Sequence, residues 1–297
     1  MKKIRIFAFI LSLITVISLF SGCGKQEVVV KSDAELAIEN DSLIKPSQNK
    51  LFRYKIYDTY IAISEYIGEE SNVTIPDTIE DKPVYVIDSE AFYSNVTVSK
   101  IVVSNNVVQI GESAFAECSR LKSLTLSNSL LDIPAKMCDG CIALESITIP
   151  DTVRTVGDSA FSVCETLEKI VIPSNVNLVG SKCFSDCANL KKVVFVDGVI
   201  TDKEGKYEKT VEKEIGMSLF KNCESLESVL ISDSVIKAED TFLGMPSTTY
   251  VYGYVPSEIA NICADEKINF VEVYEGDDKD RQMKDRSIVI PKTDEDK

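Results

Sequence analysis

Apolar residues recur along the chain at a fixed spacing of 23 residues, from Val98 through Leu121, Leu144 and Leu167 to Leu190. Five further columns share this spacing: Ile101, Leu124, Ile147, Ile170 and Val193; Val103, Leu126, Ile149, Ile172 and Phe195; Ile110, Ile133, Val156 and Val179; Phe115, Cys138, Phe161 and Phe184; Cys118, Cys141, Cys164 and Cys187. One unit cannot bury all of its apolar positions, whereas stacked units share a core. The pattern therefore predicts a solenoid.

Each unit is expected to begin with a short strand and to end with a tight turn. Ile147 and Ile149 share one face of the strand because side chains alternate along it. Pro150 follows directly, at a strand boundary where no backbone donor is needed. Gly157 then marks a turn before the sequence Ala-Phe-x-x-Cys. Successive strands should be parallel and about 4.8 Å apart, with right-handed connections.

The repeat resembles the leucine-rich repeats of the BspA type, also called Treponema pallidum-type repeats. The unit at Leu144 matches L-x-x-[IL]-x-I-P-x-x-V-x-x-[IV]-G-x-x-A-F-x-x-C at every column, and the resemblance covers residues 51–273. It implies a β-rich α/β fold, a right-handed leucine-rich-repeat solenoid of about eight coils. Members of this family are commonly surface or secreted proteins of bacteria, and several are linked with adhesion, so the resemblance also implies a surface location.

Both ends of the repeat domain, residues 51–273, are expected to be caps. Residues 51–67 alternate Tyr, Ile and Ala with polar residues, which predicts a strand pair at the N-terminal end. Residues 249–273 resemble the strand-helix-strand cap that closes such domains, with the helix at 256–264. Residues 274–297 are a charged tail beyond the cap.

Residues 1–22 have the character of a lipoprotein signal peptide, with a basic start followed by an apolar run. The segment Leu-Phe-Ser-Gly before Cys23 resembles a lipobox, in which the cysteine is acylated and becomes the new N-terminus. Phe20 departs from the aliphatic residue usual at its position, so an uncleaved anchor and ordinary cleavage near Ser21 are the alternatives. The polar residues 23–50 predict a flexible tether between membrane and domain.

The register breaks after Leu190. Cys187 and Cys223 stand 36 residues apart, thirteen more than one period, and the excess lies at about residues 200–214. This insertion is rich in Lys and Glu, and Gly205 is placed to turn a projecting hairpin. It is either a solvated loop or a binding element, since insertions in solenoids gather on one face and sometimes serve binding.

Composition excludes several kinds of function. The net charge of −15 becomes −18 once the three basic residues of the signal peptide are removed, which argues against a nucleic-acid partner. The chain has no His, which removes Ser-His-Asp and Cys-His catalysis and every His-based metal site. The Gly-x-Ser-Ala sequences at Ser113 and Ser159 lack the second glycine of a nucleophile elbow and occupy one repeat column, so they are interpreted as turns.

The chain has nine cysteines, and those other than Cys23 are expected to be buried free thiols. Disulfides along a column fit poorly, because stacked side chains keep their Cβ atoms near the strand spacing. The pair Cys138 and Cys141 lies two coils from Cys183 and Cys187, about 10 Å away, too far for one zinc ion. No metal site is expected.

The expected function is a membrane-anchored, cell-surface interaction module, an adhesin for protein partners, outside the cytoplasm and without a cofactor. The alternative is an accessory lipoprotein for glycan binding or envelope assembly, and an enzyme is the least favoured class. Recognition is expected on outward residues: Lys122, Thr125, Glu145, Thr148, Glu168, Lys191, Val171 and Val194 on the strands, and Lys203, Lys206, Tyr207 and Lys209 in the insertion. An exposed aromatic row would favour a glycan, whereas a mixed apolar and charged patch would favour a protein.

Overall fold

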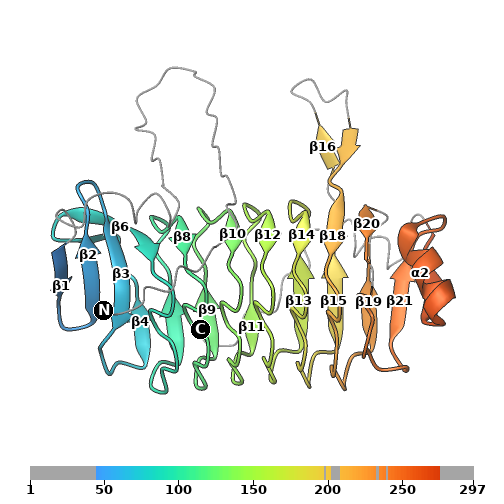
Figure 1. Cartoon of the computed structure of the whole chain (residues 1–297), viewed down its shortest axis with the longest axis horizontal. Coiled ribbons are helices and arrows are strands. Elements are labelled where there is room, and N and C mark those ends of the chain that lie inside the picture. The colour runs from blue at the N-terminus through green and yellow to red at the C-terminus, as the bar shows by residue number, and fades with distance from the viewer. Residues whose placement is uncertain (1–44, 197–198, 202–207, 232–233, 239, 275–297) are drawn as a thin grey trace, which may run out of the picture. The chain divides into compact units, whose positions relative to one another are not determined.

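The computed structural model describes residues 45–196, 199–201, 208–231, 234–238 and 240–274 (Figure 1). All of them belong to one compact unit that begins at Lys45. The predicted signal peptide, Cys23, most of the tether and nearly all of the charged tail lie outside the described residues.

Three antiparallel strands cap the N-terminal end. They are β1 (Lys45–Gln48), β2 (Phe52–Ile56) and β3 (Ile61–Tyr66), paired in the order β1-β2-β3. The predicted strand pair at residues 51–67 is confirmed. The folded unit begins earlier than predicted, because β1 falls within the residues assigned to the tether and pairs with β2.

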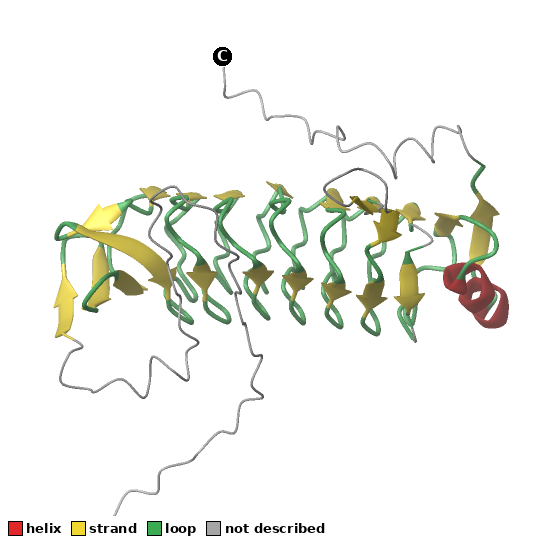
Figure 2. Cartoon of the chain, turned by 90° about the horizontal axis from the view of Figure 1, so that it is seen from above, coloured by secondary structure: helices red, strands yellow, loops and turns green. Residues whose placement is uncertain are grey.

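One side of the solenoid, called here the strand face, is built from the first strand of each coil. These strands are β4 (Asn72–Thr74), β7 (Lys100–Val102), β9 (Ser123–Thr125), β11 (Ser146–Ile147), β13 (Lys169–Ile172), β15 (Lys192–Phe195), β19 (Ser228–Leu230), β21 (Tyr250–Gly253) and β22 (Asn269–Glu272). They pair in parallel as two sheets, β11-β9-β7-β4 and β13-β15-β19-β21-β22. Figure 2 shows this row of strands facing a second row.

The second row comes from the later part of each coil. It contains β6 (Lys82–Ile87), β8 (Gln109–Ile110), β10 (Asp132–Ile133), β12 (Thr155–Val156), β14 (Leu178–Val179), β18 (Lys213–Ile215) and β20 (Val235–Lys237), and β5 (Thr78–Ile79) pairs antiparallel with β6. Ile133, Val156 and Val179 lie side by side in register. The 23-residue period therefore sets the pairing, as predicted.

The apolar columns fill the space between the two rows. Members of all six columns are buried. The aromatic rings of Phe161, Phe184, Phe220 and Phe242 stack from coil to coil, with centroids 6.0, 6.3 and 6.3 Å apart. Cys138 takes the place of a ring between Phe115 and Phe161. Stacked rings at such distances add to the free energy already gained by burying them.

Gly157 does more than mark a turn. A Cβ atom at Gly157 would lie 2.4 Å from the backbone nitrogen of Ala135 in the preceding coil, and one at Gly180 would lie 2.4 Å from that of Asp158. The glycines therefore permit the coils to approach each other closely. This contact between coils, and not backbone freedom alone, explains the glycine column.

The C-terminal end is closed by β21, the helix α2 (Glu258–Glu266) and β22. Ser257 caps the helix by accepting a hydrogen bond from the Ala260 N–H, and Ile259 and Cys263 face the core. The predicted strand-helix-strand cap is confirmed. The helix begins two residues later than predicted, because Ser257 supplies the cap beyond the proline.

The predicted insertion contains a hairpin. β16 (Val199–Thr201) pairs antiparallel with β17 (Glu208–Thr210), and Figure 1 shows β16 projecting beyond the row of coils. The chain re-enters the solenoid at β18, which pairs with β14 and β20. The hairpin prediction is confirmed.

Candidate functional site

The six charged and hydroxyl residues predicted to face outward on the strand face all do so. Lys122, Thr125, Glu145, Thr148, Glu168 and Lys191 are exposed. Thr125 is the last residue of β9 and Thr148 directly follows β11, whereas each of the four charged residues directly precedes its strand. Stacking brings residues 23 positions apart onto neighbouring coils, so these side chains form rows.

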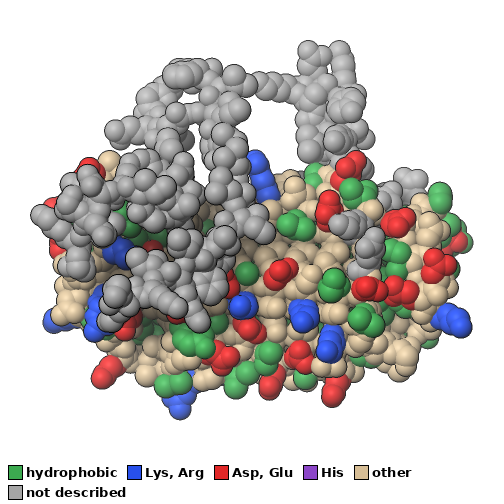
Figure 3. All heavy atoms as spheres, in the orientation of Figure 1, with side chains coloured by type: hydrophobic (Ala, Val, Ile, Leu, Met, Phe, Trp, Pro, Cys, Tyr) green, Lys and Arg blue, Asp and Glu red, His purple; other side chains and the backbone are tan. Residues whose placement is uncertain are grey.

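Within one row, opposite charges pair across neighbouring coils. The Lys122 ammonium lies 3.2 Å from the Glu145 carboxylate, and Lys191 lies 3.0 Å from Glu168. Exposed pairs of this kind contribute little, on the order of 0.2–1 kcal/mol. The charges nevertheless partly neutralise each other, so this row presents both signs and no strong field of one sign. Figure 3 shows the same mixture of acidic and basic side chains over the visible face.

The C-terminal half of the strand face is apolar, which corrects the prediction for Val194. Val194 is fully buried and Val171 is half-buried. Val194 packs in a second hydrophobic cluster, separate from the main core: Val194, Val196, Leu230 and Val273, with Val171, Tyr252 and Tyr254 packed against it. Neighbouring outward positions are apolar on several successive strands, so they cover one another. A single coil viewed in isolation does not reveal this.

Two lysines and two tyrosines border this cluster. Lys169 and Lys192 lie side by side in register on β13 and β15. Partial burial lowers the pKa of Lys169. Tyr250 is 48% exposed and Tyr252 is half-buried, with ring centroids 6.4 Å apart. The strand face thus changes from polar and charged in its N-terminal half to apolar, aromatic and basic in its C-terminal half.

Of the four predicted binding residues in the insertion, three lie outside the described residues: Lys203, Lys206 and Tyr207. Lys209 lies in β17, and its side chain is not described. The base of the insertion contains a lysine that sequence reasoning missed. Lys213 is buried, and its ammonium donates hydrogen bonds of 2.8 Å to the carbonyl oxygens of Ser174 and Val176. This lysine ties the returning chain to the preceding coil.

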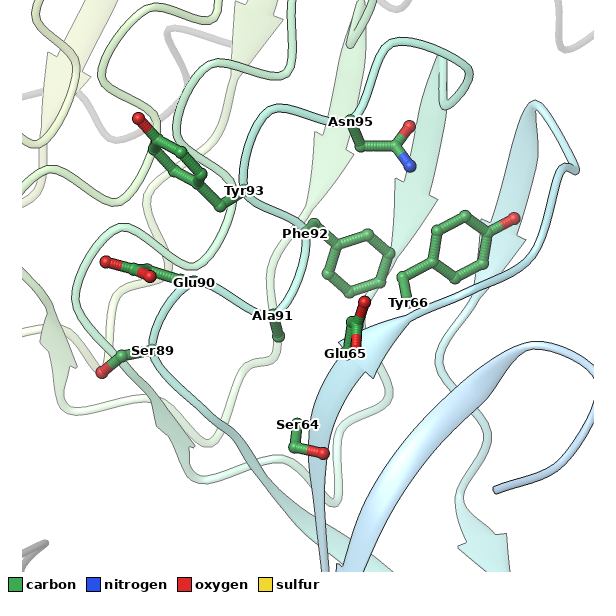
Figure 4. Close-up of a pocket in the computed structure, with 9 residues that line it drawn as sticks. All are labelled: Ser64, Glu65, Tyr66, Ser89, Glu90, Ala91, Phe92, Tyr93 and Asn95. Carbon is green, nitrogen blue, oxygen red and sulfur yellow. The ribbon is translucent and has the colours of Figure 1, made fainter. Parts of the chain in front are cut away.

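A shallow cleft of about 360 Å³ lies where the N-terminal cap meets the first coil (Figure 4). Phe92 and Tyr66 form its buried floor, with their rings stacked 5.0 Å apart. Burial, with a hydrogen bond to Glu70, raises the pKa of Tyr66 to about 12. Glu65, which contacts Arg53, and Glu90 line the cleft, as does Tyr93, which is 52% exposed. Sequence reasoning missed this cleft, because it forms only where two differently folded segments meet.

The eight cysteines of the described unit are free and buried. In the main column each thiol also donates a hydrogen bond to a backbone carbonyl of the preceding coil. The acceptors of Cys118, Cys141, Cys164, Cys187 and Cys223 are Phe92, Phe115, Cys138, Phe161 and Phe184, at 3.0 to 3.4 Å. The sequence predicted burial but not this pairing. Among the described residues, no three His, Cys, Asp or Glu side chains are arranged to hold a metal ion.

The repeat region matches a known family. The profile of the BspA type leucine rich repeat region matches residues 85–212 and 201–263, with six copies. The chain belongs to the BspA-type leucine-rich repeat family. In this family the repeat is in general a module for binding proteins and not an enzyme. The BspA-type solenoid predicted from the sequence is therefore confirmed.

Solved structures with this BspA-type fold are similar to the chain. The crystal structure of the T. pallidum leucine-rich repeat protein matches with 26% identity and a TM-score of 0.51, over 61% of this chain and 91% of that one. A leucine-rich repeat protein from Bacteroides ovatus matches with 23% identity and a TM-score of 0.51, over 71% of this chain and 56% of that one. This chain thus spans about half of the B. ovatus protein, and that likeness supports the fold alone. No curated protein matches the chain in sequence.

Proposed function

We propose that this protein is a lipid-anchored adhesin that binds protein partners through its strand face, outside the cytoplasmic membrane. The observation that carries the proposal is the contrast between a filled interior and an outward face with three kinds of surface. Apolar side chains occupy the inside of the coils, whereas the strand face combines exposed threonines, paired charges of opposite sign and an apolar, aromatic patch. Such a mixture suits a protein partner better than a small molecule.

The geometry of the strand face favours a long partner. Thr125 ends β9 and Thr148 directly follows the adjacent strand β11, and the apolar patch continues over β13, β15, β19 and β21. Parallel strands are about 4.8 Å apart, so a partner that lies across several coils contacts a different side chain on each successive coil. Recognition is then spread over many shallow contacts rather than concentrated in one pocket.

A binding experiment tests the strand face directly. The double variant Thr125→Arg and Thr148→Arg adds bulk and charge to exposed positions, and we expect it to weaken binding to immobilised extracellular matrix proteins by at least about tenfold. Asn177→Arg, an exposed position away from the strand face, is the matched control and should bind like the wild type. Equal binding by the wild type, the double variant and Asn177→Arg would show that this part of the strand face does not bind the partner.

The anchor is tested by fractionation. In the described part of the chain, no helix is long and apolar enough to span a bilayer. The proposal places the anchor at Cys23 because the preceding segment resembles a lipobox, and two or more acyl chains give stable attachment. Cys23→Ala should move the protein from the membrane fraction to the soluble fraction, with Cys263→Ala as the control. If Cys23→Ala leaves the protein on the membrane, an uncleaved N-terminal segment holds it there instead.

The cleft supports a second candidate, glycan binding. Exposed Tyr93, with carboxylates and the Asn95 amide nearby, offers a stacking surface and hydrogen-bonding groups suited to a sugar ring. Tyr93→Ala should then abolish binding to cell-wall glycan fragments, while Tyr250→Ala, an exposed tyrosine elsewhere, should not. Unchanged glycan binding by Tyr93→Ala would show that the cleft is not the glycan-binding site.

A further inference from the structure

The cleft between the N-terminal cap and the first coil has an acidic lining. Among the described residues that line it, two carry carboxylates and none is basic. Glu65 comes from β3, and Glu90 comes from the loop that follows β6. Figure 4 shows Glu65 on one side of Ala91, and Glu90 with Tyr93 on the other. A ligand in the cleft therefore meets negative charge from both sides.

The two carboxylates differ in how their charge is balanced. Glu65 contacts the guanidinium of Arg53 on the neighbouring strand β2. Glu90 is exposed and belongs to no ion pair within the described part of the chain. The Tyr93 N–H donates a 2.9 Å hydrogen bond to the Glu90 carbonyl oxygen, so one turn holds this carboxylate and the tyrosine ring on the same wall. Glu90 is therefore the carboxylate available to a bound cation.

An exposed ring and a fixed amide complete the cleft. Tyr93 is 52% exposed. The side-chain carbonyl oxygen of Asn95 accepts hydrogen bonds from the N–H groups of Thr97 and Val98, at 2.9 and 2.8 Å. These bonds fix the plane of the amide, so its nitrogen is held in place to donate to a ligand hydroxyl. An aromatic face also attracts cations, so the Tyr93 ring and the Glu90 carboxylate favour the same charge.

A sugar ring that carries a free amino group matches these features. Its ammonium pairs with the Glu90 carboxylate in a charge-assisted hydrogen bond, its ring lies against Tyr93, and a hydroxyl group accepts from Asn95. A neutral sugar would cover the Glu90 carboxylate without supplying a partner, which costs free energy. An acidic sugar would be repelled by both carboxylates.

We infer that the cleft binds an amino sugar with a free ammonium group, in preference to the N-acetylated form of the same sugar. Glycan binding in the cleft, the second candidate function, is the basis of this inference, which adds the class of sugar. N-acetylation removes the positive charge, so the ion pair with Glu90 is lost while the contact with Tyr93 remains. The preference between the two forms therefore measures the contribution of Glu90.

Calorimetric titration of the full-length chain with two oligosaccharides tests this inference. Chitosan oligosaccharide has free amino groups, and chitin oligosaccharide of equal length has N-acetyl groups on the same sugar. The wild type should bind the chitosan form at least about fivefold more tightly, because hydrogen bonds between charged groups are stronger than neutral ones. Glu90→Gln keeps the size of the side chain and removes its charge. It should abolish the preference and leave binding of the chitin form unchanged.

Glu227→Gln is the matched control. Glu227 is an exposed carboxylate directly before β19, on the strand face and outside the cleft. This variant should keep the full preference for the chitosan form. A higher salt concentration should reduce the preference of the wild type, because salt screens charges at exposed sites.

Three results would overturn the inference. Equal affinity for the two oligosaccharides contradicts the ammonium assignment and leaves glycan binding in the cleft standing. A chitosan preference that persists in Glu90→Gln places the amino-sugar site elsewhere on the protein. Binding of neither oligosaccharide removes the glycan candidate as well, and a lysine-rich peptide that binds the wild type more tightly than Glu90→Gln would then assign the cleft to a basic protein segment.

Discussion

At the scale of single residues, a left-handed backbone conformation recurs at a fixed place in each coil. Glu117, Gly140, Val163, Asp186 and Asn222 share one column, and all have φ between 56° and 75°. Glycine, asparagine and aspartate tolerate this conformation, whereas a β-branched valine rarely adopts it. Val163 is therefore the strained member of its column.

Replacing Val163 by Asn should stabilise the protein. Asn222 already stands at the equivalent position, and relieving a left-handed valine should raise the free energy of unfolding by about 1 kcal/mol. Urea unfolding measures the change. Gly140→Val, which introduces the same strain into the same column, should lower the unfolding free energy. If Val163→Asn lowers the free energy of unfolding, packing of the Val163 side chain stabilises the fold by more than the strain of its left-handed backbone destabilises it.

The buried thiols predict a loss of stability at alkaline pH. Burial raises the pKa of Cys223 and Cys263 to about 12, and raises that of Cys118, Cys138, Cys164, Cys183 and Cys187 as well. The unfolded chain releases these protons near pH 8.5, whereas the folded chain retains them. Stability is therefore intact below about pH 8.5 and falls as the pH rises from there toward the folded-state pKa values.

Thermal unfolding between pH 7 and pH 10.5 measures this fall. For each shifted thiol, the free energy of unfolding falls by about 1.4 kcal/mol per pH unit between the unfolded-state pKa and the folded-state pKa. Cys263→Ala removes one of these thiols and should flatten the pH dependence. A melting temperature that stays constant over this range would show that the thiols are not buried. Thiol reagents should label these cysteines only after denaturation, because the reactive form is the thiolate.

At the scale of the coil, the glycine column predicts a sharp difference between two similar substitutions. Gly157→Ala places a Cβ atom 2.4 Å from the Ala135 nitrogen, so backbone must move. The expected cost is about 1–3 kcal/mol or more. Gly253→Ala meets its nearest atom, the Ile231 carbonyl oxygen, at 3.2 Å, and should cost less. Denaturant unfolding compares them, and equal costs would mean that the coils separate easily.

At the scale of the whole molecule, the insertion is separable from the solenoid. Deleting residues 200–212 removes the hairpin and restores the 23-residue register, while Lys213 keeps its bonds to Ser174 and Val176. We expect the shortened protein to fold with a melting temperature within a few degrees of the wild type, because surface loops change stability little with length. Circular dichroism measures folding, and the matrix-protein binding assay measures function. Unchanged binding would make the insertion a solvated loop, and failure to fold would give it a structural role.

Local pattern determined much of this protein. The six columns and the burial of the cysteines follow from residues a fixed distance apart in one chain, because a repeated unit meets the same neighbours each time. The N-terminal cap followed from alternation of apolar and polar residues, the hairpin from the break in the register, and the C-terminal cap from the family resemblance. The family resemblance rested on these positions and is confirmed. Outward exposure of Lys122, Thr125 and their row followed from their positions between the inward columns.

Contacts between coils decided the rest. The bond from each thiol to the coil before it, the close approach at Gly157 and the pairing of Lys122 with Glu145 all depend on how two units stack. Val194 was expected to face solvent because its own strand places it outward. It is buried because Val171 and Leu230 beside it are apolar as well. Lys213 likewise finds its carbonyl partners only after the insertion returns to the solenoid. Side-chain alternation is local to one strand, whereas burial depends on every neighbouring strand at once.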